Sequence, residues 1–353
     1  MKMNENNFLV IMAGGVGSRF WPVSTDSKPK QFLDILGCGR TLIQLTFDRF
    51  KRIVPIQNVW VVTSKDYADD VREQLPEVNP AQILAEPCRR NTAPCICYVS
   101  WRIKKANPRA NIVVSPSDHM VTDIHAFEQT IEDSLEFAAE TDAIVTLGLK
   151  PTRPETGYGY IKAEMTYSSS RKSNIFRVDT FVEKPDLAHA KEFVAQPNFL
   201  WNSGIFIWNV STVVNAFRVY QPAMSKIFEN LLPVYGTEEE QAAIDREFPE
   251  CESISVDYAI LEKAEEIFVY PADFPWSDLG SWTSLREQKE KDSYGNVTVG
   301  QGIDLYDSFN CVVHATGMKK VVVQGLDGYV VAENDGQLLI CKLTEEQRIK
   351  LFH

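Results

Sequence analysis

The sequence lacks both a surplus of positive charge and any long apolar segment. Its 353 residues carry 36 Lys and Arg against 48 Asp and Glu, which gives a formal net charge of −12. A general nucleic-acid binder neutralises phosphates with excess Lys and Arg, so that class is not expected. The first apolar run, residues 8–13, is too short for the core of a signal peptide, and no later stretch approaches the roughly 20 apolar residues of a membrane span. We therefore expect a cytoplasmic protein with no nucleic-acid or membrane partner, which holds any anionic ligand with local groups.

Cysteine patterns typical of disulfide frameworks and metal sites are also lacking. The seven cysteines are an odd number scattered along the chain, with no paired CxxC. None of the five histidines lies at ligand spacing near Cys88, Cys95 and Cys97. Free cysteine is among the residue types most often buried in proteins. We therefore expect reduced, mostly buried thiols.

The apolar pattern predicts an α/β fold. Apolar residues make up 44% of the chain, which is enough for a large core. Expected strands lie at residues 8–13, 59–63, 83–86, 112–116 and 143–147, and expected helices at 42–53, 67–74 and 93–105. This alternation predicts a Rossmann-like, mostly parallel sheet with helices on both faces. Ligands of such sheets bind beyond the carboxyl ends of the strands, so the residues after each strand are the first candidates for a site.

The sequence pattern changes at about residue 293, from long expected helices and strands to short β-prone segments separated by glycines. The preceding part elaborates the first domain, with expected strands at 160–163, 175–183 and 205–208 and expected helices at 187–194, 210–220, 224–232, 238–248 and 256–263. We predict domains at residues 1–292 and 293–353, the second small and β-rich. Asn296, Gly300, Gly302 and Gly317 could mark corners of a short left-handed β-helix, although no clean hexapeptide period is present.

A glycine-rich turn follows the first expected strand. Gly14, Gly15 and Gly17 would let backbone N–H groups approach a polyphosphate without a Cβ in the way. No GK[ST] follows, so the turn is not a P-loop. Phe20 stands where a dinucleotide fingerprint has its third glycine, which disfavours a nicotinamide or flavin enzyme.

Cations flank this turn. Arg19 follows it directly, and Lys28-Pro29-Lys30 lies about ten residues further on, so that positive charge could fold over bound phosphates from two sides. Exposed lysines are usually only solvated. The combination of a glycine turn, Ser18-Arg19 and Pro29-Lys30 is much more specific than any of its parts.

This combination closely resembles the nucleotide-binding motif of sugar-1-phosphate nucleotidylyltransferases, G-x-G-[ST]-R followed by P-K. The strings WPVS and PKQFL resemble the mannose-1-phosphate guanylyltransferase branch of that family. The resemblance continues in order along nearly the whole chain, through EPCRRNTAP, SPSDH, TGYGYI, FVEKP, WNSGIF and DLGSW.

The resemblance implies a GT-A-like nucleotidyltransferase catalytic domain in residues 1–292. The implied reaction is transfer of GMP from GTP to α-D-mannose 1-phosphate, which gives GDP-mannose and pyrophosphate by in-line attack on the α-phosphorus. It implies Mg²⁺ on Asp118 and Asp278, although each aspartate could instead only stabilise a turn. Arg19 and Lys30 would stabilise the transferring phosphoryl group and the pyrophosphate, and Lys184 would hold the incoming sugar phosphate.

Glu86 is the candidate for reading the base. A carboxylate accepts from guanine N1–H and N2–H₂ together, but it would repel O4 of uracil or thymine, so Glu86 favours GTP. Asn91 and Thr92 could complete the base and ribose contacts, or could simply cap a helix. The full expected nucleotide-binding set is Ala13, Gly14, Gly15, Gly17, Ser18, Glu86, Asn91, Thr92 and Ser117.

The expected sugar-binding residues are Gly157, Glu183 and Asn202. Gly157 permits backbone contact, Asn202 offers a bidentate amide to hydroxyls, and the resemblance makes Glu183 a hydroxyl acceptor. Consecutive residues of a strand point to opposite faces, so Glu183 and Lys184 can share a ligand only if the strand twists or bulges. We expect that break at Pro185.

Other functions compatible with the sequence remain open. The sugar could be a manno-configured heptose or a deoxyhexose, and a non-catalytic nucleotide-sugar sensor could keep the same fold. Some relatives carry a further phosphomannose isomerase domain with a metal-binding cupin barrel, which we do not expect in a chain ending at His353. The tail after Ser293 is expected to support a homodimer or a lid, although it could equally cap a monomer.

Overall fold

The structure is a computed structural model that describes residues 3–15, 17–168, 172 and 174–352. It divides into two compact units. The first unit contains the chain up to Gly14, Arg49–Pro116 and Thr122–Pro275; the second contains Gly15–Asp48, Ser117–Val121 and Trp276 onward. The second unit therefore combines most of the glycine turn with one short later segment and with the last part of the chain. The sequence-based domain boundary at residue 293 stays a prediction.

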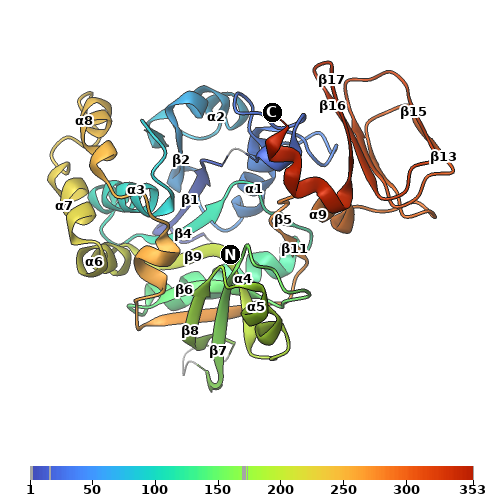
Figure 1. The fold of residues 1–353 in the computed structure, drawn as a ribbon. Coiled ribbons are helices and arrows are strands. Elements are labelled where there is room, and N and C mark those ends of the chain that lie inside the picture. Colours follow the sequence, from blue (N-terminus) through green and yellow to red (C-terminus); the bar gives the residue numbers. More distant parts are fainter. Residues whose placement is uncertain (1–2, 16, 169–171, 173, 353) are drawn as a thin grey trace. The chain divides into compact units, whose positions relative to one another are not determined.

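The first unit is built on a sheet with the strand order β3-β2-β1-β4-β9-β6-β10-β8-β7 (Figure 1). Its strands are β1 (Asn7–Ala13), β2 (Val59–Ser64), β3 (Ile83–Glu86), β4 (Asn111–Pro116), β6 (Ile144–Leu149), β7 (Gly159–Ser168), β8 (Phe176–Glu183), β9 (Phe199–Asn209) and β10 (Ile267–Ala272). Pairing is parallel from β3 to β4, as predicted. It is also parallel between β6 and β10, a strand that was not predicted. It is antiparallel where β9 lies between β4 and β6, and along β7 and β8. The sheet is therefore mixed.

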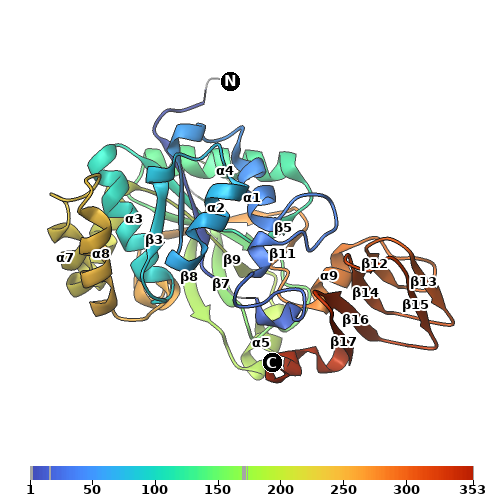
Figure 2. The same ribbon diagram turned by 90° about the horizontal axis from the view of Figure 1, so that it is seen from above.

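Helices cover both faces of this sheet because its central strands are apolar on both sides. Alternate residues such as Phe8 and Val10 belong to a core shared with helices α3 (Thr92–Ala106), α6 (Val210–Tyr220) and α7 (Pro222–Asn230). Leu9 and Ile11 on the other face are equally buried. Helix α4 contributes Phe127, whose ring packs edge-on against Phe50 at 5.2 Å. Both views show α3, α7 and α8 grouped together (Figures 1 and 2).

The helices are bounded close to the predictions where a cap is present in the sequence. They are α1 (Leu42–Phe50), α2 (Ala68–Gln74), α3 (Thr92–Ala106), α4 (Ile124–Ala139), α5 (Leu187–Val194), α6 (Val210–Tyr220), α7 (Pro222–Asn230), α8 (Glu240–Glu247) and α9 (Trp282–Gln288). Asn91, Asp186 and Asn209 each accept a backbone N–H at the start of the helix that follows. In the described part of the chain, no helix has the length and apolarity needed to cross a membrane.

The second unit ends in short strands that alternate between two sheets. They are β12 (Val297–Val299), β13 (Ile303–Tyr306), β14 (Val312–Ala315), β15 (Val321–Gln324), β16 (Tyr329–Asn334) and β17 (Gln337–Lys342). Strands β12, β14 and β16 pair in parallel, and so do β13 and β15, while β17 is antiparallel to β16. The two layers face each other (Figure 1), and Val313, Val323 and Val331 form the core of this part.

A second apolar core fixes the glycine turn to the later segments of the same unit. Phe20 packs edge-on against Trp282 at 4.9 Å, and Ile35, Leu285 and Val330 are fully buried in the same cluster. All seven cysteines are free, and Cys95, Cys97, Cys251, Cys311 and Cys341 are buried, as predicted for most of them.

Candidate active site

The glycine turn is held in place from within each unit. In the first unit, β1 ends at Ala13, whose carbonyl accepts a hydrogen bond from Thr63 Oγ1 at 2.8 Å. In the second unit, Gln31 Nε2 donates to the carbonyl of Gly15 at 2.8 Å. Gly17 has a φ of 70°, and a Cβ there would lie 2.7 Å from Cγ of Lys30. Only glycine fits, because the stem of Lys30 lies against this backbone.

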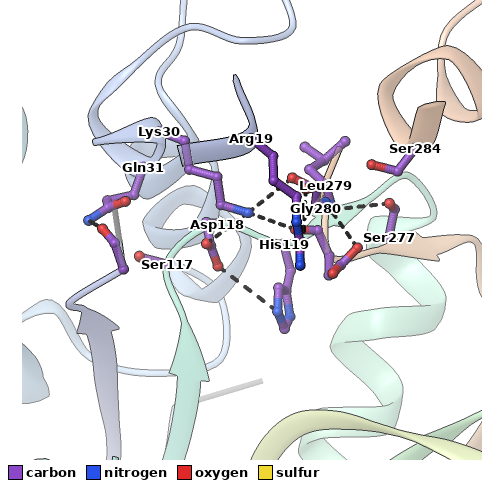
Figure 3. Close-up of polar contacts among 12 residues, drawn as sticks. Arg19, Lys30, Gln31, Ser117, Asp118, His119, Ser277, Leu279, Gly280 and Ser284 are labelled. Atoms are coloured by element: carbon purple, nitrogen blue, oxygen red, sulfur yellow. Dashed lines mark hydrogen bonds and ion pairs between the residues drawn. The ribbon is translucent and has the colours of Figure 1, made fainter. Parts of the chain in front are cut away.

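Lys30 uses all of its hydrogen-bond donors inside the second unit. Its Nζ lies 3.0 Å from Asp118 Oδ2 and donates to the carbonyls of Asp278 at 2.9 Å and Leu279 at 3.0 Å. An ammonium group has three N–H donors, so all three have acceptors. Figure 3 shows Nζ at the centre of these contacts, and Lys30 as a whole is only 7% exposed.

Asp118 and Asp278 are brought close by a short antiparallel ribbon. Strand β5 (Met120–Val121) pairs with β11 (Trp276–Ser277), with Met120 opposite Ser277. Continuing this register places Leu279 near Asp118, which is where Lys30 bridges the two segments. Leu279 has a φ of 43°, a strained value for a branched residue, and its N–H is held by Ser277 Oγ at 3.1 Å.

The carboxyl of Asp118 is stabilised in its charged form. Burial raises its pKa, but the positive charges of Lys30 and His119 lower it by more, so the pKa lies below the ordinary value. His119 Nε2 lies 4.0 Å from Asp118 Oδ1, and its ring packs edge-on against Trp276 at 5.1 Å. His119 therefore lies between the carboxyl of Asp118 and the ring of Trp276.

Arg19 supplies the accessible positive charge of this group. It is exposed, and its Nη1 lies 3.4 Å from the carbonyl of Gly280. A guanidinium has five N–H donors, so most remain open to phosphate oxygens. Lys30 therefore contacts segments that carry Asp118 and Asp278, and Arg19 contacts Gly280 in the same unit. Figure 3 labels Arg19, Lys30 and Asp118, and the catalytic roles of all four residues stay a prediction.

Asp118 and Asp278 both offer carboxylate oxygens, the kind of ligand that a hard cation prefers. Among the described residues, no group of three or more His, Cys, Asp and Glu side chains could hold a metal ion. Asp278 Oδ1 accepts the N–H of Gly280 at 3.1 Å, and the charged Asp118 offers further carboxylate oxygens. Mg²⁺ takes one or two protein carboxylates and completes its shell with phosphates and water, so two aspartates fit it.

Glu86 ends β3 in the first unit with an unsatisfied oxygen. Its Oε1 is buried and has no hydrogen-bond partner among the described residues, and Glu86 is only 9% exposed. Burial raises the pKa of its carboxyl to about 8, although a hydrogen bond from the Cys95 thiol lowers it. A buried acceptor without a donor is costly, so it marks a place where a ligand donor would be favourable.

Other predicted nucleotide-binding residues have structural partners within the protein. Asn91, at a φ of 66°, accepts from the N–H of Thr92 at 2.9 Å, and Thr92 Oγ1 accepts from the N–H of Val256 at 2.9 Å. In the second unit, the carbonyl of Ser117 accepts from Thr46 Oγ1 at 3.2 Å, and Ser117 is 2% exposed. These contacts agree with the helix-cap alternative for Asn91 and Thr92, and a role of all three in nucleotide binding stays a prediction.

Glu183 and Lys184 lie on the same side of the chain. Lys184 has a φ of 48°, which breaks the alternation at Lys184 itself, one residue before the predicted break at Pro185. Lys184 Nζ consequently reaches Glu183 Oε1 at 2.7 Å. Gly159 pairs with Glu183 across the β7–β8 ladder, and a Cβ on Gly159 would lie 2.5 Å from Glu183 Oε2. Gly157 is exposed in the preceding turn, where its N–H is bound to Glu155 Oε1.

Asn202 lies beside these residues, together with an aspartate that the sequence did not reveal. Asn202 Nδ2 donates to Asp257 Oδ1 at 2.9 Å, and its Oδ1 accepts from Thr146 Oγ1 at 3.0 Å and from the N–H of Gly204 at 3.2 Å. The amide therefore has one N–H left and cannot bind hydroxyls in the predicted bidentate manner. Asp257 carries no glycine or motif around it, so nothing in the sequence distinguishes it from an ordinary helical residue.

Comparisons with known proteins agree with one another over most of the chain. The family model described as "Nucleotidyl transferase" matches residues 9–294. A curated mannose-1-phosphate guanylyltransferase from Escherichia coli is 34% identical over 97% of this chain and 74% of that protein. The alginate biosynthesis protein AlgA of Pseudomonas aeruginosa is 36% identical over 97% of this chain and 70% of that protein. A crystal structure from Thermus thermophilus, described as a mannose-1-phosphate geranyltransferase, has a TM-score of 0.85 at 32% identity and covers 98% of both chains.

Proposed function

The chain belongs to the nucleotidyl transferase family, as a relative of mannose-1-phosphate guanylyltransferases, and we propose that it transfers GMP from GTP to α-D-mannose 1-phosphate. The products are GDP-mannose and pyrophosphate. The observation that carries this proposal is the grouping of Arg19, Lys30, Asp118 and Asp278 in one unit. Such a grouping provides both the positive charge and the carboxylates that chemistry on a nucleoside triphosphate requires.

The reaction is an in-line displacement without a covalent enzyme intermediate. A phosphate oxygen of mannose 1-phosphate attacks the α-phosphorus of GTP, and the bond from that phosphorus to the oxygen bridging the α- and β-phosphates breaks. Pyrophosphate leaves with that oxygen and its electron pair. Both reactants are anions, so the residues that bind them act mainly by neutralising charge and by holding nucleophile and leaving group in line.

Arg19 and Lys30 supply positive charge in two different ways. Arg19 is exposed, and its guanidinium is free to contact the transferring phosphoryl group and the pyrophosphate. Lys30 is surrounded by three acceptors, so its charge acts from a fixed position while its bonds hold the Asp118 and Asp278 segments together. Lys184, whose side chain is 53% exposed, is the residue that we assign to the phosphate of the sugar substrate.

Asp118 and Asp278 would hold Mg²⁺. When bound, this ion would neutralise the phosphates and polarise the phosphorus that is attacked. The low pKa of Asp118 supports this assignment, because the carboxylate stays charged at physiological pH without a metal ion.

Glu86 is assigned to the guanine base, and Glu183 and its neighbours are assigned to the sugar. The buried oxygen of Glu86 without a partner supports acceptance from guanine N1–H and N2–H₂. These two donors would favour the ionised carboxyl and so lower the pKa that burial raises. Glu183, the remaining N–H of Asn202 and the Gly157 turn are assigned to sugar hydroxyls. A manno-heptose or deoxyhexose 1-phosphate as the substrate, or a non-catalytic sensor, remain the alternatives.

The organisation of the whole protein is also proposed. We assign residues 1–292 to catalysis and residues 293–353 to a small domain, in which the parallel pairing of β12, β14 and β16 supports a left-handed β-helix. We propose that this domain supports a homodimer. Free thiols at all seven cysteines support a reducing compartment, and hence the cytoplasm.

A substrate panel tests the proposal. The protein is incubated with each of the four NTPs, a series of sugar 1-phosphates and Mg²⁺, and pyrophosphate release is measured. We expect the highest rate with GTP and mannose 1-phosphate. A higher rate with a heptose or deoxyhexose 1-phosphate would favour the first alternative, and GTP binding without any turnover would favour the sensor.

A further inference from the structure

Asp257 begins a short π-helical segment, Asp257–Leu261, directly beside the proposed sugar-binding residues. The π-helix is rare and occurs frequently at functional sites. The neighbouring Lys184 carries a second local irregularity, a left-handed backbone with φ of 48°. Two unfavourable backbone features next to the same polar group indicate a position shaped for a ligand.

The contacts of Asn202 show which groups remain open to such a ligand. Its oxygen is saturated by Thr146 Oγ1 and the Gly204 N–H, and the latter, a donor, fixes the orientation of the amide. Its nitrogen therefore faces Asp257 Oδ1, at 2.9 Å, with one N–H unused. Asn202 can consequently donate one hydrogen bond to a sugar hydroxyl but cannot accept one.

Asp257 provides the acceptor that Asn202 lacks. Its carboxyl receives hydrogen bonds from Asn202, from Ser255 and from its own backbone N–H. A carboxylate has about four acceptor positions, so one remains. Asp257 is partly exposed, which leaves that position accessible.

Charge in this group favours hydroxyl donors. Burial and the nearby Glu183 carboxylate raise the pKa of Asp257 to about 6, while Lys184 lowers it, so Asp257 is mostly ionised at pH 7. Glu183 is already bound to Lys184 Nζ at 2.7 Å. Two carboxylates and one ammonium leave a net negative charge, which attracts the positive hydrogen of an O–H group.

We propose that Asp257 is a sugar-binding residue, whose carboxylate accepts a hydrogen bond from one hydroxyl of the sugar 1-phosphate and thereby helps to select the sugar. The inference rests on the proposed transferase function. It adds a specificity-determining residue from a segment outside the motifs that the family resemblance marked.

Asp257→Asn tests the proposal because it removes the charge while keeping an oxygen for Asn202. We expect KM for mannose 1-phosphate to rise by roughly 10- to 100-fold, the effect of weakening a charged hydrogen bond, with KM for GTP changed less than about twofold. The matched control is Glu252→Gln, which removes one negative charge from an exposed residue five positions earlier and should change neither constant.

Deoxy analogues distinguish direct contact from a structural role. The unsubstituted protein is assayed with 2-, 3-, 4- and 6-deoxymannose 1-phosphate. For each analogue, the loss is the fold-decrease in kcat/KM relative to mannose 1-phosphate. In Asp257→Asn, the loss for one analogue should disappear while the others persist. Asp257→Glu, which keeps the charge but moves the carboxylate, should abolish the same loss and serves if the first variant is unstable.

The outcomes separate the two proposals. If the unsubstituted protein turns over no sugar 1-phosphate, the transferase function fails and the role of Asp257 fails with it. If turnover is normal but both variants retain every analogue's loss and the original KM, only the role of Asp257 is overturned.

Discussion

Replacement of Glu86 by Gln should stabilise the protein increasingly as the pH rises. The folded protein raises the pKa of Glu86 from 4.5 to about 8, mainly because burial disfavours the charged form. A carboxyl with a raised pKa in the folded state contributes its full stability below the unfolded value, 4.5, and loses it as the pH rises through about 8. Glutamine has no charge to bury, so its contribution does not change over this range.

The size of the effect follows from the same two values. Within this window, each pH unit changes the contribution of Glu86 to the free energy of unfolding by about 1.36 kcal/mol. Between pH 5.5 and pH 7.5, the free energy of unfolding of Glu86→Gln minus that of the unsubstituted protein should therefore increase by roughly 2.5 kcal/mol. Titration of other groups cancels in this difference, because both proteins contain them.

Urea denaturation at the two pH values measures the difference, and Glu252→Gln provides the control for loss of an exposed glutamate. The reasoning about Glu86 is refuted if the difference between the two proteins is the same at pH 5.5 and pH 7.5. A difference that does not change with pH would mean that Glu86 takes up no proton when the protein folds.

The same substitution should weaken and broaden nucleotide recognition. Glutamine keeps one acceptor but replaces the other with a donor, which opposes guanine N2–H₂ and instead matches uracil N3–H and O4. We expect kcat/KM for GTP to fall by roughly 10- to 100-fold and the preference for GTP over UTP to narrow. Glu86 would then be an instance in which function retains a destabilising residue.

Three further substitutions test the second unit. Arg19→Ala should lower kcat/KM at least about 100-fold, the loss found when a preorganised donor to a transition state is removed; normal turnover would contradict its role. Lys30→Gln should lower the free energy of unfolding, measured by urea denaturation, by roughly 3 kcal/mol, because the Asp118 carboxylate loses its partner. An unchanged free energy of unfolding would show that the three contacts of Lys30 Nζ are dispensable. Gly17→Ala should lower the free energy of unfolding by about 1 to 3 kcal/mol, because the φ of Gly17 is 70° and a Cβ would contact Lys30. Gly14→Ala should change it little, because a Cβ there would have nothing within 4 Å. Equal decreases for the two variants would contradict this explanation.

The elements that could be predicted from the sequence are those specified locally. Helices α5 and α6 have the predicted bounds because Asp186 and Asn209 mark their starts. Helix α4 was not predicted although Asp123 caps it and its apolar residues recur at helical spacing, so the signal was present. The antiparallel direction of β9 was not predictable, because it depends on pairing with β4 and β6, which are distant in the sequence.

The candidate site shows the same division between local chemistry and distant partners. Glycine at position 17 is required by a local φ, and Arg19, two residues later in the same motif, is exposed. The environment of Lys30 depends on carbonyls 248 and 249 residues away, and only the β5–β11 ribbon decides that all its donors are used.

Side chains identified by type can therefore differ in availability once their partners are known. Lys30 and Arg19 carry the same charge in the sequence, but the structure leaves only Arg19 with open donors for a phosphate. Asn202 changes in the same way, from a bidentate amide to a single donor, because Thr146 and Gly204 take its oxygen. The acceptor that a sugar hydroxyl then needs must come from another residue, and Asp257, bonded to that amide at 2.9 Å, is placed to supply it.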